Sequence, residues 1–500
     1  MGTPMSESAL QPDPRRWKAL AFIALAQLMV VLDATIVNIA LPTAQADLHI
    51  SDANRQWVIT AYALAFGGLL LFGGRIADLW GRRRTFIVGL SGFALASALG
   101  GAAANTGMLL GARALQGLFG ALLAPAALSL LAVMFTEAQE RAKAFGIYGA
   151  IAGGGSAIGL TLGGLLTEYL NWRWTFFVNI PFAAVAITGA VLVIREPAQG
   201  RNRSKLDIPG VLLVSTGLVS LVYGFTRAES DGWTAGTTLG LFAAAVVLLL
   251  AFVLVERSVK APLLPLRVVT NRNRAGVYLS LGLAVIGMFG LFLFLTYYLQ
   301  VVLRYSPVVT GLAFLPMVAG MITGSTQIGA RLMTKVAPRL LIVPGFTVAS
   351  LGMLILTQIK VDSSYPVHIL PGLILMGLGM GTAFMPAMSL ATYGVEPRDA
   401  GVASAMVNTS QQVGGAIGTA LLNTIATSAM TSWIKSHQAL AQTPQGKLVG
   451  MVHSFSTAIW CSFGILLLAA AIAFVFINVG RPSAQEQAVE QEDAVPVLAH

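Results

Sequence analysis

The sequence predicts an all-α membrane protein with about fourteen transmembrane helices, arranged as two six-helix bundles with two linker helices inserted between them. Hydrophobic residues make up 56% of the 500-residue chain and charged residues only 10%, whereas about a quarter of the residues of a soluble domain are charged. Apolar runs of the roughly 20 residues that a helix needs to cross the hydrocarbon recur from end to end. The lipid bilayer is therefore the expected surrounding of this fold.

The apolar runs predict the individual helices in order. Six are expected at 19–42, 57–77, 85–104, 108–133, 142–167 and 174–194. Two follow at 208–226 and 237–256, and six more at 275–301, 308–330, 339–358, 368–393, 400–428 and 457–478. The first run is interpreted as a retained helix, because a secretory signal has a charge-free core of only about 7 to 15 residues and this run includes Asp33.

The positions of the basic residues predict the orientation. With the N-terminus inside, 23 of the 31 Lys and Arg residues lie in inner segments and seven in outer segments. This bias places both termini in the cytoplasm, and the protein in a bacterial inner membrane. The formal net charge of +10 thus reflects topology, and no nucleic-acid partner is expected because the sequence contains no motif for binding one.

Two basic stretches predict the domain boundaries. We expect an N-terminal six-helix bundle in 1–205, two inserted transmembrane helices in 206–260, a C-terminal six-helix bundle in 261–480 and a disordered cytoplasmic tail in 481–500. A long polar outer loop is expected at 429–456. The two bundles show a weak internal repeat, typical of transporters built from parallel halves. It relates 125–129 to 386–389, and Gly73, Arg75 and Arg83 to Gly329, Arg331 and Arg339.

Asp33 is an acidic residue deep inside the first predicted helix. It stands about 9 residues, or roughly 13 Å at 1.5 Å per residue, from the outer end. A carboxylate at that depth costs several kcal/mol unless it is protonated, paired or open to a wet cavity, so it indicates a functional site. The alternative interpretation is an interhelical hydrogen-bond anchor.

Arg113 lies at nearly the same depth in the fourth predicted helix, about 5 residues or roughly 8 Å below its outer end. A guanidinium keeps its charge, so we expect this one to set the proton affinity of a nearby acid or to bind an anion. The alternative is that Arg113 snorkels outward to lipid phosphates.

Two glycine-containing motifs indicate sites of conformational change. The short inner loop after the second helix holds Gly74, Asp78, Gly81, Arg82 and Arg83, and we expect its charges to form a latch that opens and closes. A basic loop that only sets topology is the alternative. On the fifth helix, a groove for close helix packing is predicted from the recurring glycines Gly155, Gly159, Gly163 and Gly164. Generic packing would explain these glycines equally well.

These residues resemble the major facilitator superfamily, and specifically its fourteen-helix drug:proton antiporter branch. Four segments carry the resemblance, which covers nearly the whole chain: 32–42 in the first helix, the loop 74–84, 113–117 in the fourth helix and 172–181 at the start of the sixth. The resemblance implies two bundles that rock around a central cavity. It also implies that Asp33 binds protons or cationic substrate, that Arg113 takes part in proton coupling, and that Asp78, Arg82 and Arg83 form the latch.

One departure from the branch's pattern concerns the fifth helix. Its antiporter motif has Pro after the second glycine, where this chain has Leu160. The direction of transport therefore stays open at this point.

The expected function is secondary active export of amphipathic drugs or related small molecules in exchange for protons. The alternative is a proton-coupled transporter of a specific metabolite, lipid or antibiotic on the same fold. ATP is not the expected energy source, because no Gly-rich phosphate loop with Lys-Ser or Lys-Thr occurs. An enzyme is not expected either, since no nucleophile–base pair or metal-ligand cluster is evident. Expected partners are the small-molecule substrate, protons and lipid, with no cofactor or metal. A periplasmic adaptor is neither predicted nor excluded.

Overall fold

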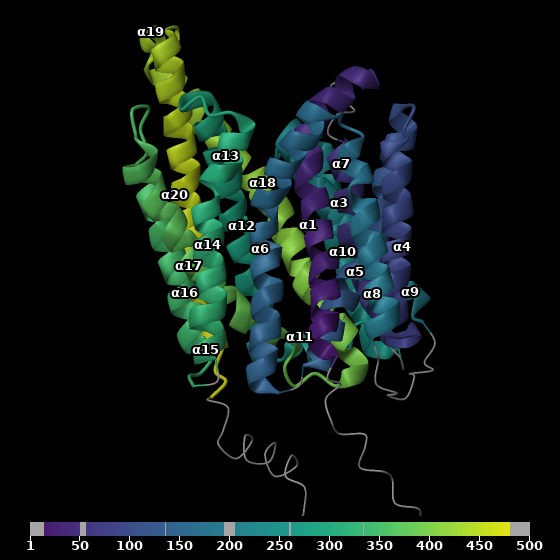
Figure 1. The fold of residues 1–500 in the computed structure, drawn as a ribbon. Coiled ribbons are helices and arrows are strands. Elements are labelled where there is room, and N and C mark those ends of the chain that lie inside the picture. The colour runs from purple at the N-terminus through teal and green to yellow at the C-terminus, as the bar shows by residue number, and fades with distance from the viewer. Residues whose placement is uncertain are drawn as a thin grey trace, which may run out of the picture.

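The computed structural model describes residues 15–50, 57–135, 137–194, 206–259, 262–333 and 335–480, and these ranges contain helices and no strand. The long helices run along one common direction (Figure 1). The described chain begins and ends at the bottom of Figure 1, which we call the lower end, and the opposite end is the upper end. The predicted tail at 481–500 lies outside the described residues.

The first half of the chain forms a group of mutually packed helices. Its elements are α1 Arg16–Asp47, α3 Trp57–Trp80, α4 Arg82–Gly101, α5 Thr106–Met134, α6 Ala138–Tyr169, α7 Trp174–Phe177 and α8 Asn179–Val193. Helix α5 packs against α3 and α4, while α1 packs against α6 and α8. The sixth expected span is divided at Val178 into α7 and α8.

The second half repeats this arrangement with more irregular helices. Its elements are α11 Leu266–Thr270, α12 Arg272–Tyr297, η2 Tyr298–Val302, α13 Pro307–Ala313, α14 Leu315–Thr323, η3 Gly324–Gly329, α15 Ala330–Leu332, α16 Arg339–Leu356, η4 Tyr365–Ile369, α17 Leu370–Thr392, η5 Pro397–Asp399, α18 Ala400–Ser436, α19 Gln438–Ala441 and α20 Pro444–Phe476. The segments η2, η3 and η4 are π-helical turns within longer helices. Helices α12, α16, α18 and α20 pack together.

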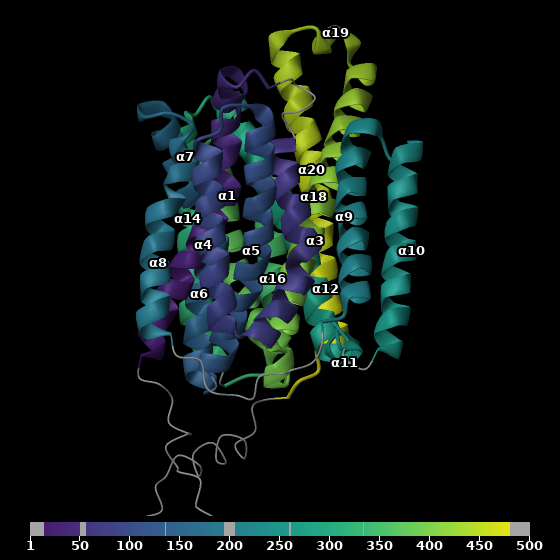
Figure 2. The same cartoon turned by 90° about the vertical axis from the view of Figure 1, so that its right-hand side faces the viewer.

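Two inserted helices stand between the halves in sequence and beside them in space. They are α9 Ile208–Asp231 and α10 Gly236–Ser258, which pack against each other. Helix α9 also contacts α3 and α18, whereas α10 lies at the outer edge (Figure 2). Apolar side chains such as Val247, Leu250 and Leu254 on α10 are 60% or more exposed, as expected of a helix whose outer face meets lipid.

The fourteen-helix prediction is confirmed. Among the described residues, thirteen helices are long and apolar enough to cross a membrane. Helix α6, with 32 residues, is a further long helix that runs from the lower to the upper end (Figure 1). The exact domain boundaries stay predictions.

The predicted polar loop at 429–456 is wrong. Helix α18 continues to Ser436 and α20 begins at Pro444, so most of this segment is helical. The two extensions pack on each other, because a Cβ at Gly450 would lie 2.6 Å from the Trp433 ring. The polar composition that suggests a loop reflects helices that project beyond the hydrocarbon.

Close packing of α3 on α5 depends on a glycine. A Cβ at Gly73 would overlap the backbone carbonyl of Ala121, and backbone cannot move aside as a flexible side chain can. Gly111 lies on α5, as Ala121 does, but a Cβ at Gly111 would meet no atom within 4 Å.

We therefore predict opposite effects for two alanine substitutions. Gly73→Ala should lower the free energy of unfolding by roughly 1–3 kcal/mol, because it overpacks the interface. Gly111→Ala should raise it by up to about 1 kcal/mol, because glycine is a poor helix former. The measurement is thermal unfolding of the purified protein in detergent, and equal effects at the two positions would contradict the packing analysis.

Candidate functional site

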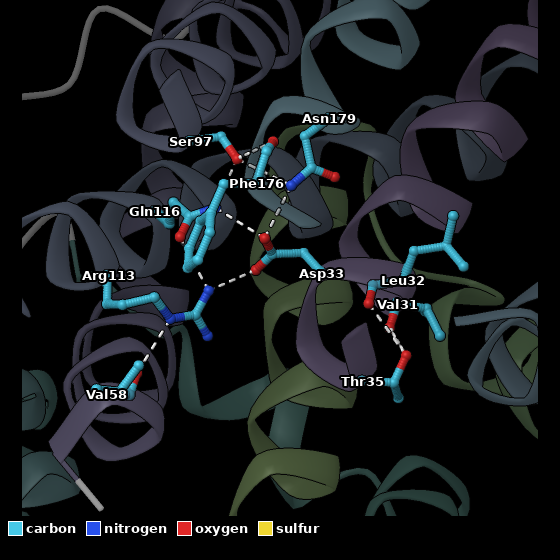
Figure 3. Close-up of polar contacts among 10 residues, drawn as sticks. All are labelled: Val31, Leu32, Asp33, Thr35, Val58, Ser97, Arg113, Gln116, Phe176 and Asn179. Carbon is cyan, nitrogen blue, oxygen red and sulfur yellow. Dashed lines mark hydrogen bonds and ion pairs between the residues drawn. The ribbon is translucent and has the colours of Figure 1, made fainter. Parts of the chain in front are cut away.

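Four helices of the first half, α1, α4, α5 and α8, contribute the polar side chains of a network centred on one buried carboxylate (Figure 3). Asp33 on α1 is completely buried and lies among Arg113 and Gln116 of α5, Asn179 of α8 and Ser97 of α4. Each of these partners is at most 1% exposed. The group therefore forms a polar network sealed inside an otherwise apolar bundle.

The Asp33 carboxylate accepts hydrogen bonds on both oxygens. Its Oδ2 accepts one from Nη1 of Arg113 at 2.7 Å, and this contact is also an ion pair. Its Oδ1 accepts from Nε2 of Gln116 at 2.8 Å and from Nδ2 of Asn179 at 2.9 Å. Three donors to one buried carboxylate stabilise its charged form and offset the loss of water.

The Arg113 guanidinium is held in place from several sides. Its Nε donates to the backbone carbonyl of Val58 at 3.0 Å, and its Nη1 donates to Oε1 of Gln116 at 2.9 Å. The guanidinium carbon lies 4.4 Å from the centre of the Tyr62 ring, a cation–π contact. The alternative that Arg113 snorkels to lipid is wrong, because the side chain points into the bundle.

Ser97 connects the two amides of the network. Its hydroxyl accepts hydrogen bonds from Gln116 at 3.1 Å and from Asn179 at 2.9 Å, and donates to the carbonyl of Phe176 at 2.9 Å. Gln116 and Asn179 stand within the 113–117 and 172–181 motifs, but neither is among the predicted site residues. Asn179 reaches Asp33 because α8 begins at this residue, directly after the break at Val178.

Three of the four predicted glycines on α6 form a contact with α1. A Cβ at Gly155 would lie 2.9 Å from Val31, one at Gly159 would overlap Thr35, and one at Gly163 would lie 3.2 Å from Ile36. Gly164 faces another way, toward Val308 at 4.0 Å, so it does not belong to the same face. Figure 3 shows Thr35 pointing away from the Asp33 network. This α1–α6 contact is therefore a separate interface on the other side of α1.

At the lower end, Asp78 of α3 joins the two halves. Its Oδ1 accepts a hydrogen bond from the backbone N–H of Gly401 at 3.0 Å, and its Oδ2 accepts one from Val402 at 3.2 Å. These N–H groups belong to the first turn of α18, where an anion is stabilised by free donors and by the helix dipole. Gly74 permits the approach, since a Cβ there would lie 2.5 Å from the carbonyl oxygen of Gly401.

The other predicted latch residues act within the first half. Arg82 forms an ion pair with Asp78 at 3.3 Å and donates from Nε to the Ser129 hydroxyl at 2.7 Å. Arg83 donates to the carbonyls of Ala190 and Val191 on α8 at 3.2 and 2.6 Å. Gly81, at φ 100°, makes the turn from α3 into α4 in a conformation that favours glycine.

Arg141, which the sequence analysis did not select, makes a second contact between the halves. From the start of α6 it donates to the hydroxyl and the carbonyl of Ser389 at 3.1 and 3.2 Å, and to the Thr392 hydroxyl at 2.6 Å. It is 8% exposed. Ser129 and Ser389 lie in the repeated segments 125–129 and 386–389, and each accepts a hydrogen bond from an arginine.

These hydrogen bonds join the two halves at the lower end. We call Asp78 with Gly401 and Val402, and Arg141 with Ser389 and Thr392, the lower latch. Ser325 on η3 adds a hydrogen bond to the carbonyl of Gly146 at 2.9 Å. Among the described residues, no group of three or more His, Cys, Asp or Glu side chains is placed to hold a metal ion.

Comparison with known proteins identifies relatives over almost the whole chain. The family model of the Major Facilitator Superfamily matches residues 23–419. The puromycin resistance protein pur8 of Streptomyces alboniger is 54% identical over 486 residues, which cover 97% of this chain and 96% of that protein. The cephamycin export protein CmcT of Amycolatopsis lactamdurans is 38% identical, covering 81% of this chain and 84% of its own. The tetracenomycin C resistance and export protein of Streptomyces glaucescens is 34% identical, and the match covers 86% of this chain and 80% of that protein.

Solved structures share the fold at low sequence identity. The human organic anion transporter MFSD10 (TETRAN) superposes with a TM-score of 0.63 at 16% identity, covering 93% of this chain and 100% of that chain. The proton:xylose symporter XylE gives a TM-score of 0.62 at 14% identity, and the match covers 94% of this chain and 97% of that chain. At these identities the likeness shows the fold alone.

The buried ion pair predicts strongly coupled effects of mutation. Arg113→Gln should lower the free energy of unfolding by roughly 3–5 kcal/mol, because it leaves the Asp33 carboxylate buried without its cation. The double variant Asp33→Asn/Arg113→Gln should be less destabilised than Arg113→Gln alone. Unfolding of the single and double variants in detergent measures this coupling, and simply additive effects would rule it out.

The lower latch predicts that loss of Arg141 separates the halves at that end. Hydrogen bonds to a charged group contribute roughly 1.5–3 kcal/mol each, so Arg141→Ala should shift the population toward an open lower end by about tenfold or more. Spin labels at Trp80→Cys on α3 and Leu340→Cys on α16, both exposed, would report the distance between the halves. The sequence has one native cysteine, Cys461, which Cys461→Ser removes.

The matched control for this measurement is Lys143→Ala, because Lys143 is exposed two residues farther along α6. It should leave the distance distribution unchanged. If Arg141→Ala gives the same distribution as Lys143→Ala, Arg141 does not hold the lower end closed.

Proposed function

The chain belongs to the major facilitator superfamily, and on this basis we propose that it is a secondary transporter exporting amphipathic drugs or related small molecules in exchange for protons. The observation that carries the proposal is the sealed ion pair between Asp33 and Arg113, 2.7 Å apart in the centre of the first half. A titratable acid at that depth is costly, and proton transfer gives it a function.

The names of the relatives support export as the direction. Several are named for resistance to an antibiotic or for its export, including the 54% identical puromycin resistance protein. Resistance by transport requires that the compound leave the cell. Leu160 is the one departure from the antiporter motif, and the similarity to two proteins named for export outweighs it because it extends over 81% and 86% of the chain.

Proton binding at Asp33 would change the packing of three helices. Protonation removes the negative charge that balances Arg113 and weakens the hydrogen bonds from Gln116 and Asn179, so α1, α5 and α8 lose their shared anchor. In the present conformation the carboxylate has no exposure to solvent. We therefore place proton entry in a different conformation, in which the halves have moved and water reaches the network.

The lower latch would serve as the gate on the cytoplasmic side. The basic residues of the inner segments assign the lower end to the cytoplasm. With the lower latch made, exchange of substrate and protons would take place from the upper, external side. Breaking the contacts of Asp78 and Arg141 would open the cytoplasmic side, and the two states would alternate during transport.

A transporter dedicated to a single antibiotic is the second candidate. It is favoured by the names of the three relatives described above, each of which refers to one antibiotic or antibiotic class. The two candidates differ in substrate range and share the same coupling site. A susceptibility panel that includes puromycin, a cephamycin and tetracenomycin C in a pump-deficient host separates them, because a dedicated exporter protects against one class.

We predict that Asp33→Asn abolishes proton-driven export while the protein still reaches the membrane. Asparagine keeps the size of the side chain but cannot bind or release the proton, so resistance should fall to the level of the host without the transporter. The control is Asp47→Asn on the same helix, whose carboxylate is 48% exposed and whose loss should preserve resistance. Proteoliposomes with an imposed pH gradient measure the coupling directly, and unimpaired transport by Asp33→Asn would defeat the assignment.

A further inference from the structure

Two buried carboxylates meet at the lower end of the inserted helices, where neither the Asp33 network nor the lower latch includes them. Asp207 precedes α9, and its Oδ1 accepts a hydrogen bond from the backbone N–H of Gly210 at 3.0 Å. Glu256 lies near the end of α10, and its oxygens accept from the N–H groups of Leu263 and Leu264 at 3.2 and 3.0 Å. Asp207 is 6% exposed and Glu256 is 4% exposed.

The second oxygen of Asp207 is directed toward Glu256. A Cβ at Gly210 would lie 2.7 Å from Oε1 of Glu256 and would overlap Oδ2 of Asp207, so both oxygens border the space that this glycine leaves open. Both oxygens lie no more than 2.7 Å from that one point, so the two carboxyl groups are close neighbours. Yet Oδ2 of Asp207 has no hydrogen-bond donor among the described residues. Two carboxylates can form a hydrogen bond only if one of them carries a proton.

The backbone around the pair stabilises one negative charge better than two. The N–H groups of Gly210, Leu263 and Leu264 are the donors, and the N-terminus of α9 adds its dipole. These dipoles are directed at Oδ1 of Asp207 and at the two oxygens of Glu256. None of them is directed at Oδ2 of Asp207. A second negative charge on that oxygen would therefore lack a stabilising hydrogen-bond donor.

The charged groups on the neighbouring elements have other partners or lie elsewhere. On α10, Arg257 is exposed. On α11, Arg267 is paired with Asp399. On α3, Asp78 is bound to the N-terminus of α18 and Arg75 lies one turn before it. Asp207 is the described charged side chain that borders Glu256 beside Gly210.

We propose that Asp207 and Glu256 form a proton-binding site, in which Oδ2 of Asp207 and Oε1 of Glu256 share one proton. Like-charged carboxylates at such close range share a proton because they cannot both ionise without a large electrostatic cost. The proton comes from water at the lower end, and its uptake changes the charge of the pair from two negative charges to one. The two groups titrate as a unit.

The site lies where proton binding can affect the contact between the halves. The shared proton holds together the start of α9, the end of α10 and the segment that leads into α11. The same region forms a buried apolar cluster that includes Leu263 and Leu264, together with Leu71 of α3 and Val402 of α18. Val402 is also a partner of Asp78 in the lower latch. Proton loss from the pair would therefore loosen the packing beside the lower latch.

The first test looks for the shared proton itself, in infrared spectra of the purified full-length protein recorded over a range of pH. The wild type should show a protonated-carboxyl band that disappears in alkali. Asp207→Asn and Glu256→Gln should each remove this one band, because the carboxylate that remains then accepts a hydrogen bond from an amide. Asp231→Asn, at the other end of α9, is the control and should retain the band.

A band that survives in either Asp207→Asn or Glu256→Gln would overturn the proposal, because one acid would then be protonated independently of the other. The absence from the wild type of any band sensitive to these substitutions would overturn it as well. Neither result depends on which compound is transported, so this test is independent of the test of export.

A second test uses the pH dependence of Tm. The folded chain holds a proton that the unfolded chain releases, so Tm of the wild type should fall as pH rises past the point at which the pair ionises. Asp207→Asn should remove this fall, since its amide Nδ2 replaces the proton while Oδ1 still accepts from Gly210. Glu256→Gln should lower Tm at every pH, because its N–H group would face the N–H of Leu263 or Leu264. Identical pH profiles for the wild type and both variants would contradict a shared proton.

Discussion

A charge inside a membrane protein must find its partners within the protein, because the surrounding hydrocarbon offers none. The Asp33–Arg113 ion pair meets this requirement with help from five helices. Arg113 is balanced by Asp33 and braced by the Val58 carbonyl and the Tyr62 ring, while Gln116 and Asn179 complete the hydrogen bonds of the carboxylate. The positions of α1, α3, α4, α5 and α8 follow from this arrangement, since moving any one of them would leave a buried polar group without a partner.

The polar contacts between the halves are of a different kind. At the lower latch, Asp78 binds backbone N–H groups at the start of α18, and Arg141 binds hydroxyl and carbonyl oxygens on α17. Such bonds can be exchanged for water at the end of a bundle, whereas the side chains of the Asp33 network are buried. On this basis we expect the first half to move as one body and any opening to occur between the halves. This division suits the alternation between two states proposed above.

The membrane-spanning helices could be predicted from the sequence because each requires a long apolar run. The Asp33–Arg113 pair could be predicted because the rise of the helix places both residues at one depth. No such signal marks Gln116 and Asn179 in the sequence, because burying a neutral amide in a membrane helix costs much less free energy than burying a charged group. Arg141 lies at a helix end, where a basic residue is expected from topology alone. Asp207 and Glu256 were missed for the same reason: at the boundary of a span, an acid looks like an ordinary loop charge until the fold brings two of them together.

The two serines of the internal repeat differ in where their arginine comes from. Ser129 binds Arg82 of its own half, whereas Ser389 binds Arg141 of the opposite half. The repeat pairs Arg83 with Arg339, so Arg82 corresponds to Pro338, which has no side-chain donor. Movement of one half against the other would therefore leave the Arg82–Ser129 bond intact and would break the Arg141–Ser389 bond.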